Sequence, residues 1–104
     1  MGKYVMAYTG GGTAETPEAQ QEAMTQWMNW FGSLGDSIVD MGAPFGPSLT
    51  VGPDGSISDR GRAGLTGYSI VTADSLADAS DKAKGCPILT GGGSIEVYEA
   101  IPMG

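Results

Sequence analysis

The chain has 104 residues, 40% of them hydrophobic, and this length suits a single domain with one core over residues 1–104. Five basic residues stand against twelve acidic ones, and the formal charge of -7 repels phosphate backbones and anionic lipid, which excludes nucleic acid and membrane surfaces as partners. One cysteine allows no intrachain disulfide, and the absence of histidine excludes His-ligated haem and His-dependent catalytic dyads.

The first predicted elements are a strand and a long helix. Residues 3–9 alternate with a period of two, which predicts a strand. The large side chains of this alternation are Tyr4, Met6 and Tyr8. Thr16 as N-cap and Pro17 in the first helical position predict the start of a helix, and Gly35 predicts its end. Between them, apolar residues recur at helical spacing: Ala23, Trp27, Trp30 and Leu34.

The middle of the chain is predicted to hold two strands with a small hairpin between them. Residues 36–45 are expected to form the second strand of the main sheet. Residues 48–51 and 56–58 resemble the two arms of a hairpin around the turn at 52–55, which contains proline, aspartate and glycine. Residues 67–72 follow as the next main strand.

A second helix and a final strand complete the chain. Ser75 is the expected N-cap of this helix, and Gly85 is its expected end. Residues 94–101 alternate again and predict the last strand. The order of elements predicts an α+β fold, namely a ferredoxin-like βαββαβ sandwich with an extra small hairpin.

Two helices can cover only one face of a four-stranded sheet. The composition of the other face therefore decides whether it remains in water or is covered by a partner. We expect six large side chains there: Tyr4, Met6, Tyr8, Tyr68, Ile70 and Tyr98. Such a surface is too apolar to remain in water, and a symmetric homodimer, sheet against sheet, would cover it.

Several short motifs resemble the YCII-related family of small proteins. They are Gly61-Arg62-Ala63-Gly64-Leu65-Thr66-Gly67-Tyr68-Ser69-Ile70-Val71, Asp74-Ser75-Leu76, Cys86-Pro87 and Ile95-Glu96-Val97. The resemblance covers essentially the whole chain and implies a dimeric α+β barrel. It implies no reaction, because Asp59 is not followed by the Gly-Pro-Phe of the family's Asp-Gly-Pro-Phe signature and the chain lacks the histidine of the YciI-type His–Asp pair.

Asp40 is the candidate catalytic residue. It lies among apolar neighbours, and burial there would favour the protonated carboxyl and suit it to acid–base work. The alternative is an edge-strand aspartate that points into water. Arg60 and Arg62 precede the third main strand and either hold an anionic ligand or form surface and subunit ion pairs.

Three tyrosines are candidate ligand-binding residues, because a phenol combines apolar bulk with a hydroxyl that needs a partner: Tyr8, Tyr68 and Tyr98. They suit a dimer interface and a pocket wall equally. Trp27 and Trp30 are interpreted as core residues, and Cys86 as a buried space-filling side chain. The glycine triplets lack the flanking residues of a phosphate-binding loop, and no acidic cluster has metal-loop spacing, so we expect no cofactor and no metal.

Three hypotheses about function follow. The first is a homodimer that binds a small organic or anionic molecule between its sheet faces. The second is an isomerase, lyase or decarboxylase with Asp40 as base and Arg60 or Arg62 holding the substrate. The third is a structural or regulatory partner domain without a ligand. Because no run of apolar residues suits a signal peptide or a membrane span, a cytoplasmic location is expected.

Overall fold

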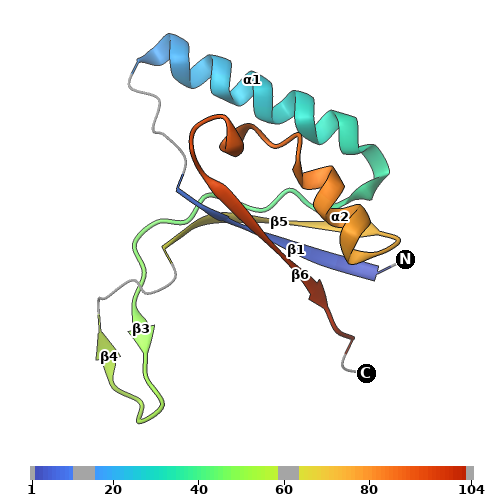
Figure 1. Cartoon of the computed structure of the whole chain (residues 1–104). Helices are drawn as coiled ribbons and strands as arrows, with labels where there is room; N and C mark the ends of the chain where they lie inside the picture. Colours follow the sequence, from blue (N-terminus) through green and yellow to red (C-terminus); the bar gives the residue numbers. More distant parts are fainter. Residues whose placement is uncertain (1, 11–15, 59–63, 103–104) are drawn as a thin grey trace.

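The computed structural model describes residues 2–10, 16–58 and 64–102 and has an α+β fold (Figure 1). The strands and helices, with two short 3-10 turns (η), are β1 (Gly2–Thr9), α1 (Pro17–Leu34), η1 (Gly35–Ser37), β2 (Ile38–Asp40), β3 (Thr50–Val51), β4 (Ile57–Ser58), β5 (Leu65–Ala73), α2 (Leu76–Ala83), η2 (Pro87–Leu89) and β6 (Ser94–Ala100). The main sheet has four antiparallel strands in the order β2-β5-β1-β6, and β3 pairs with β4 in a separate hairpin.

Both helices begin at the predicted caps. The Thr16 hydroxyl accepts a hydrogen bond from the amide of Ala19 at 3.1 Å, and the Ser75 hydroxyl accepts one from the amide of Asp78 at 3.0 Å. Gly35 ends α1 with a positive φ of 54°, as its position predicts. Sequence signals at the helix ends therefore fix where α1 and α2 start and where α1 stops.

The second main strand is much shorter than predicted, since only Ile38–Asp40 pairs with β5. Gly42 has a φ of 81° and passes so close to the carbonyl of Tyr68 that a Cβ atom would overlap it. Pro44 has no amide hydrogen and makes only an isolated bridge to Gly67. The chain therefore leaves the ladder after Asp40 and runs irregularly beside β5.

The face assigned to the first strand is wrong. Its three large side chains, Tyr4, Met6 and Tyr8, point toward the helices and are buried in the core with Trp30 and Val71. Alternation alone does not indicate which of the two faces of a strand is buried when the side chains on both faces are largely apolar. Here the larger side chains of β1 fill the space beneath the helices. Gly67, opposite Tyr8 in the register, leaves room for that ring.

The other side of the sheet, called the open face below, carries a mixture of apolar and polar side chains. The register places six of them together: Val5, Ala7, Tyr68, Ile70, Glu96 and Tyr98. Figure 1 shows both helices on the opposite side of the sheet and the β3–β4 hairpin extending away from them. The molecule is flat, with extents of 43 × 42 × 18 Å, and its radius of gyration of 15.1 Å exceeds the value of about 13 Å for a compact domain of this length.

Among the described residues, neither helix combines the length and the apolar character needed to cross a bilayer.

Candidate functional site

The open face carries a hydrogen-bonded pair of side chains at its β2 edge. The Tyr68 hydroxyl donates to Oδ2 of Asp40 at 3.1 Å, and the amide of Gly42 donates to Oδ1 of the same carboxylate at 2.8 Å. The hydrogen bond to Asp40, together with the negative charge of that carboxylate, raises the pKa of Tyr68 above its ordinary value. Both carboxylate oxygens are therefore held in a fixed orientation.

Phe45 extends this pair with an aromatic surface. Its ring lies stacked beside that of Tyr68, with centroids 5.6 Å apart and planes inclined by 21°. The amide of Phe45 donates to the carbonyl of Thr66 at 2.9 Å, which fixes the segment after Gly42 against β5. Phe45 was not predicted as a site residue, because its segment was expected to be regular strand rather than an irregular segment beside β5.

Register determines what surrounds the pair. Asp40 lies opposite Ile70, which is paired with Val5, and Val5 is paired in turn with Tyr98 on the far edge. The next row contains Ala7 between Tyr68 and Glu96. A carboxylate and a phenol thus border a strip of apolar side chains, which suits a ligand that is part polar and part flat and apolar.

The single chain does not bury Asp40. The side chain is exposed on an edge strand, and its neighbours Val39 and Met41 are exposed as well. This agrees with the interpretation of an edge-strand aspartate in water. What the sequence did not reveal is the tyrosine within hydrogen-bonding distance of that carboxylate.

Of the three candidate tyrosines, the structure places two on the open face. Tyr68 and Tyr98 lie there, and Tyr98 is 57% exposed. Tyr8 does not, and its prediction as a residue of that face is corrected here. Its ring contacts the edge of Trp27 with centroids 5.3 Å apart, inside the helix-covered core. Arg60 and Arg62 lie outside the described residues.

Tyr8 takes part in a buried chain of hydrogen bonds instead. Its hydroxyl donates to Ser69 at 2.7 Å, and Ser69 donates to the carbonyl of Met41 at 2.8 Å. Burial raises the pKa of Tyr8 above its ordinary value of 10.0. Ser69 is fully buried, so this chain ties the irregular segment after β2 to the centre of the sheet.

The predicted core residues agree with the structure at two positions. Trp30 is buried, and its indole nitrogen donates to the carbonyl of Lys82 at 3.1 Å, which joins the two helices. Cys86 is buried, and burial raises the pKa of its thiol to about 11, so the unreactive thiol form predominates at neutral pH.

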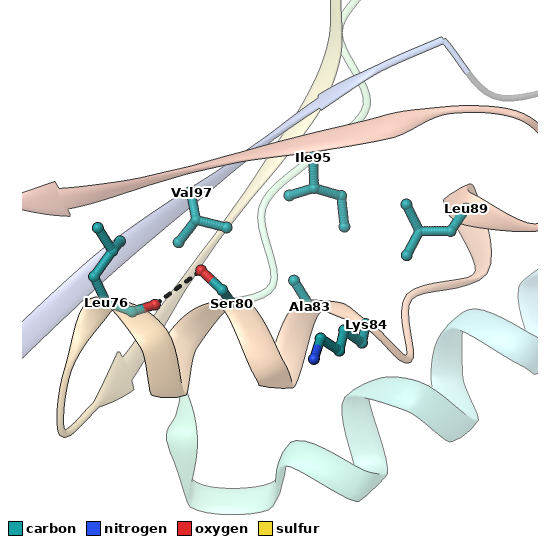
Figure 2. Close-up of a pocket in the computed structure, with 7 residues that line it drawn as sticks. All are labelled: Leu76, Ser80, Ala83, Lys84, Leu89, Ile95 and Val97. Carbon is teal, nitrogen blue, oxygen red and sulfur yellow. Dashed lines mark hydrogen bonds between the residues drawn. The ribbon is translucent and has the colours of Figure 1, made fainter.

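A second concave region lies between α2 and the edge strand β6 (Figure 2). This groove of about 280 Å³ is lined mainly by apolar side chains: Leu76, Ala83, Leu89, Ile95 and Val97. Its two polar residues are engaged on their own helix, since Ser80 donates to the carbonyl of Leu76 at 2.8 Å and Lys84 pairs with Asp81 at 2.9 Å. The groove therefore favours an apolar occupant.

No protein-family model matches the chain, and no curated protein matches it either. Its function is therefore inferred from the geometry of the open face together with the resemblance of its motifs.

Proposed function

We propose that two copies of this chain pack their open faces together in a dimeric α+β barrel of the YCII-related type, and that the space between the sheets binds a small organic molecule. The strand order β2-β5-β1-β6, with both helices on one side, supports the ferredoxin-like arrangement on which such barrels are built. A twofold axis would bring the same apolar strip of each copy together.

The exposed area supports association. The chain exposes 7243 Å², whereas a monomeric protein of 10.6 kDa exposes about 5,500 Å². The surplus of about 1,800 Å² per chain amounts to about 3,600 Å² for two chains, within the total of about 2,000–5,000 Å² that an obligate dimer buries. Two open faces in contact would remove a large part of this surplus.

The observation that carries the binding proposal is the oriented pair of Asp40 and Tyr68 beside the ring of Phe45. A carboxylate with both oxygens fixed accepts a hydrogen bond from a ligand at little entropic cost, and the aromatic rings offer it a flat contact. The ligand class is therefore a small molecule with one donor group and a planar apolar part. An anionic group on that ligand, held by Arg60 or Arg62, stays a prediction.

The test is a screen of aromatic amines and aromatic carboxylic acids by two-dimensional NMR on the native protein. Binding compounds should shift the amide signals of β5 and of residues 40–45. Asp40→Asn should weaken their affinity at least about tenfold, because a hydrogen bond to a charged group is lost. Glu99→Gln is the matched control, since Glu99 pairs with Tyr4 on the helix side of the sheet and should change nothing.

Two results would reject this function. One is an open face whose signals no compound shifts, and the other is binding that Asp40→Asn and Glu99→Gln affect equally. A dimer that forms normally but binds none of the compounds would favour a structural or regulatory partner domain instead.

A carboxylate-dependent isomerase, lyase or decarboxylase is the second candidate, and the 3.1 Å contact between Tyr68 and Asp40 favours it. Asp40 can take a proton from a carbon acid while the phenol of Tyr68 donates a hydrogen bond to the charge that develops. Deuterium uptake from D₂O into a bound acid, followed by NMR, should then occur in the native protein and stop in Asp40→Asn. Uptake that persists in this variant would exclude Asp40 as the base.

A further inference from the structure

The β3–β4 hairpin, with its flanking residues 48–58, is called the arm below. Its turn is well specified: the amide of Gly52 donates to the carbonyl of Ser56 at 2.7 Å, and Oδ1 of Asp54 accepts from the amide of Ser56 at 2.9 Å. Gly55 adopts a φ of 84°, which suits glycine at this position. The arm is therefore a defined structure rather than an irregular loop.

One face of the arm is apolar and the other is polar. Val51 is paired with Ile57, so their side chains share one face, and Leu49 adds a third apolar side chain just before the paired residues. These three side chains are 68% (Leu49), 67% (Val51) and 66% (Ile57) exposed. Thr50 and Ser58 are paired on the opposite face. A two-stranded hairpin is marginally stable in water by itself, so an apolar face of this kind needs a surface to pack on.

No described residue of the arm's own chain covers this apolar face, since all three side chains remain about two-thirds exposed. Figure 1 shows the arm extending from the sheet on the side away from α1 and α2, where a second copy would sit in the proposed dimer. Phe45 is held against β5 and the turn begins at Pro53, so residues 46–52 between them span at most about 23 Å, whereas two packed sheets lie about 10 Å apart. This segment is long enough for the arm to pass the partner's sheet and reach the layer that holds its helices.

The groove between α2 and β6 is the apolar surface in that layer. Ile95 and Val97 form its sheet side and Leu76 and Leu89 its helix side, as Figure 2 shows. β6 is an edge strand with one unpaired side, so the groove opens at the margin of the sheet, where an arm can enter. The apolar face of the arm and the apolar lining of the groove are thus complementary in chemistry.

We propose that the arm of each copy crosses the edge of the partner's sheet and packs Leu49, Val51 and Ile57 into the partner's groove between α2 and β6. This inference rests on the proposed dimer and adds a second contact to it. The surplus surface of about 1,800 Å² per chain is large enough for the open face and the two exchanged arms together.

The first experiment compares two aspartate substitutions on opposite faces of the arm, Ile57→Asp and Ser58→Asp. Sedimentation equilibrium should show a dimer dissociation constant at least about tenfold higher for Ile57→Asp, because a charge enters an apolar contact. Ser58→Asp should leave the constant unchanged. Circular dichroism checks that both variants keep the fold, which is expected because these side chains lie outside the core.

The second experiment locates the contact. In a Cys86→Ser background, the double variant Val51→Cys with Leu89→Cys should form a disulfide-linked dimer under mild oxidation, visible on a non-reducing gel. Ser58→Cys with Leu89→Cys is the matched control and should remain mostly unlinked, since Ser58 faces away from the groove. Equal cross-linking of both pairs would overturn the proposed orientation of the arm.

The result for the open face is read separately, with Ile70→Asp. If Ile70→Asp yields a monomer while Ile57→Asp does not weaken association and no disulfide forms, the arm contact is refuted and the barrel dimer stands. If the arm contact is found but Ile70→Asp has no effect, the open-face dimer of the proposed function is refuted.

A native protein that is monomeric at about 100 μM would refute both. An added apolar compound that fills the groove without changing association would assign the groove to a small ligand and overturn the arm contact.

Discussion

The two faces of the four-stranded sheet come from the same strands, yet they differ in almost every physical respect. Met6 and Val71 are fully buried beneath the helices, whereas Tyr98, on the other side of the sheet, is more than half exposed. The inner face satisfies its polar groups internally, as in the hydrogen bonds from Tyr8 to Ser69 and from Ser69 to Met41. The open face keeps its carboxylate and its phenol at the surface. One face therefore holds the fold together, and the other is available for contact with something outside the chain.

Adjacent positions of β1 provide the strongest test of this difference. Met6→Ala should lower the free energy of unfolding by about 2–5 kcal/mol, because it leaves a cavity in the core. Val5→Ala, on the open face, should cost less than about 1 kcal/mol in dilute protein, where no second copy covers it. Urea unfolding at low concentration measures both. Equal losses would mean that the open face contributes to the core of the single chain.

Alkaline pH should lower the stability of the folded chain through groups buried on the helix-covered face. The pKa of Cys86 is raised from 9.0 to about 11 by burial, so between these values the unfolded chain loses a proton that the folded chain retains. Stability is therefore full below pH 9 and falls as the pH rises toward 11, by about 1–3 kcal/mol from this group. Tyr8, whose pKa is also raised by burial, adds to the loss above pH 10.

Urea unfolding at pH 8, 9 and 10 follows this loss. Cys86→Ala should flatten the decline between pH 9 and 10, even though it lowers stability at pH 8. An unchanged slope in that variant would show that other groups cause the decline.

The tyrosine hydroxyl groups on the two faces should also contribute differently to the free energy of unfolding. Tyr8→Phe removes a buried hydrogen bond to Ser69 and should cost about 1–2 kcal/mol in unfolding free energy. Tyr68→Phe removes an exposed hydrogen bond to Asp40 and should cost less than about 0.5 kcal/mol. Thermal or urea unfolding of the two variants, side by side, gives the comparison. A larger loss for Tyr68→Phe would reverse the roles assigned to the two faces.

The smallest effect on the single chain is expected at Tyr98. Tyr98→Ala should change the unfolding free energy of dilute protein by less than about 0.5 kcal/mol, because the side chain is largely exposed. At higher concentration, the same variant should weaken association of the proposed dimer. Sedimentation across a range of concentrations separates these two readouts, and a variant that associates normally would remove Tyr98 from the interface.

Local signals in the sequence predicted most of the secondary structure. Thr16 and Ser75 marked helix starts, and the turn at residues 52–55 marked the hairpin, because each of these features depends only on neighbouring residues. The extent of β2 was not predictable in this way. It depends on the approach of Gly42 to Tyr68, two residues that are far apart in the chain.

Contacts between residues far apart in the chain also explain which features of the site were not predicted. Asp40 and Tyr68 were each singled out from the sequence, but the hydrogen bond between them requires the register shift of β2 against β5. Phe45 stacks beside Tyr68 where the irregular segment after Gly42 is hydrogen-bonded to β5. The face predicted for Tyr8 was wrong because the side chains on both faces of β1 are largely apolar, and only packing against the helices distinguishes the two faces. Pairings between distant segments decide these points, and spacing within one segment does not encode them.

The two margins of the sheet have unequal capacity to recruit further strands. β2 offers three residues and is followed by Gly42 and Pro44, so it gives an incoming chain little to pair with. β6 offers seven residues along its free side. Growth of an endless fibril requires a receptive margin at both ends of every subunit. Among the described strands only β6 forms such a margin, which opposes open-ended strand addition and agrees with the proposed closed dimer.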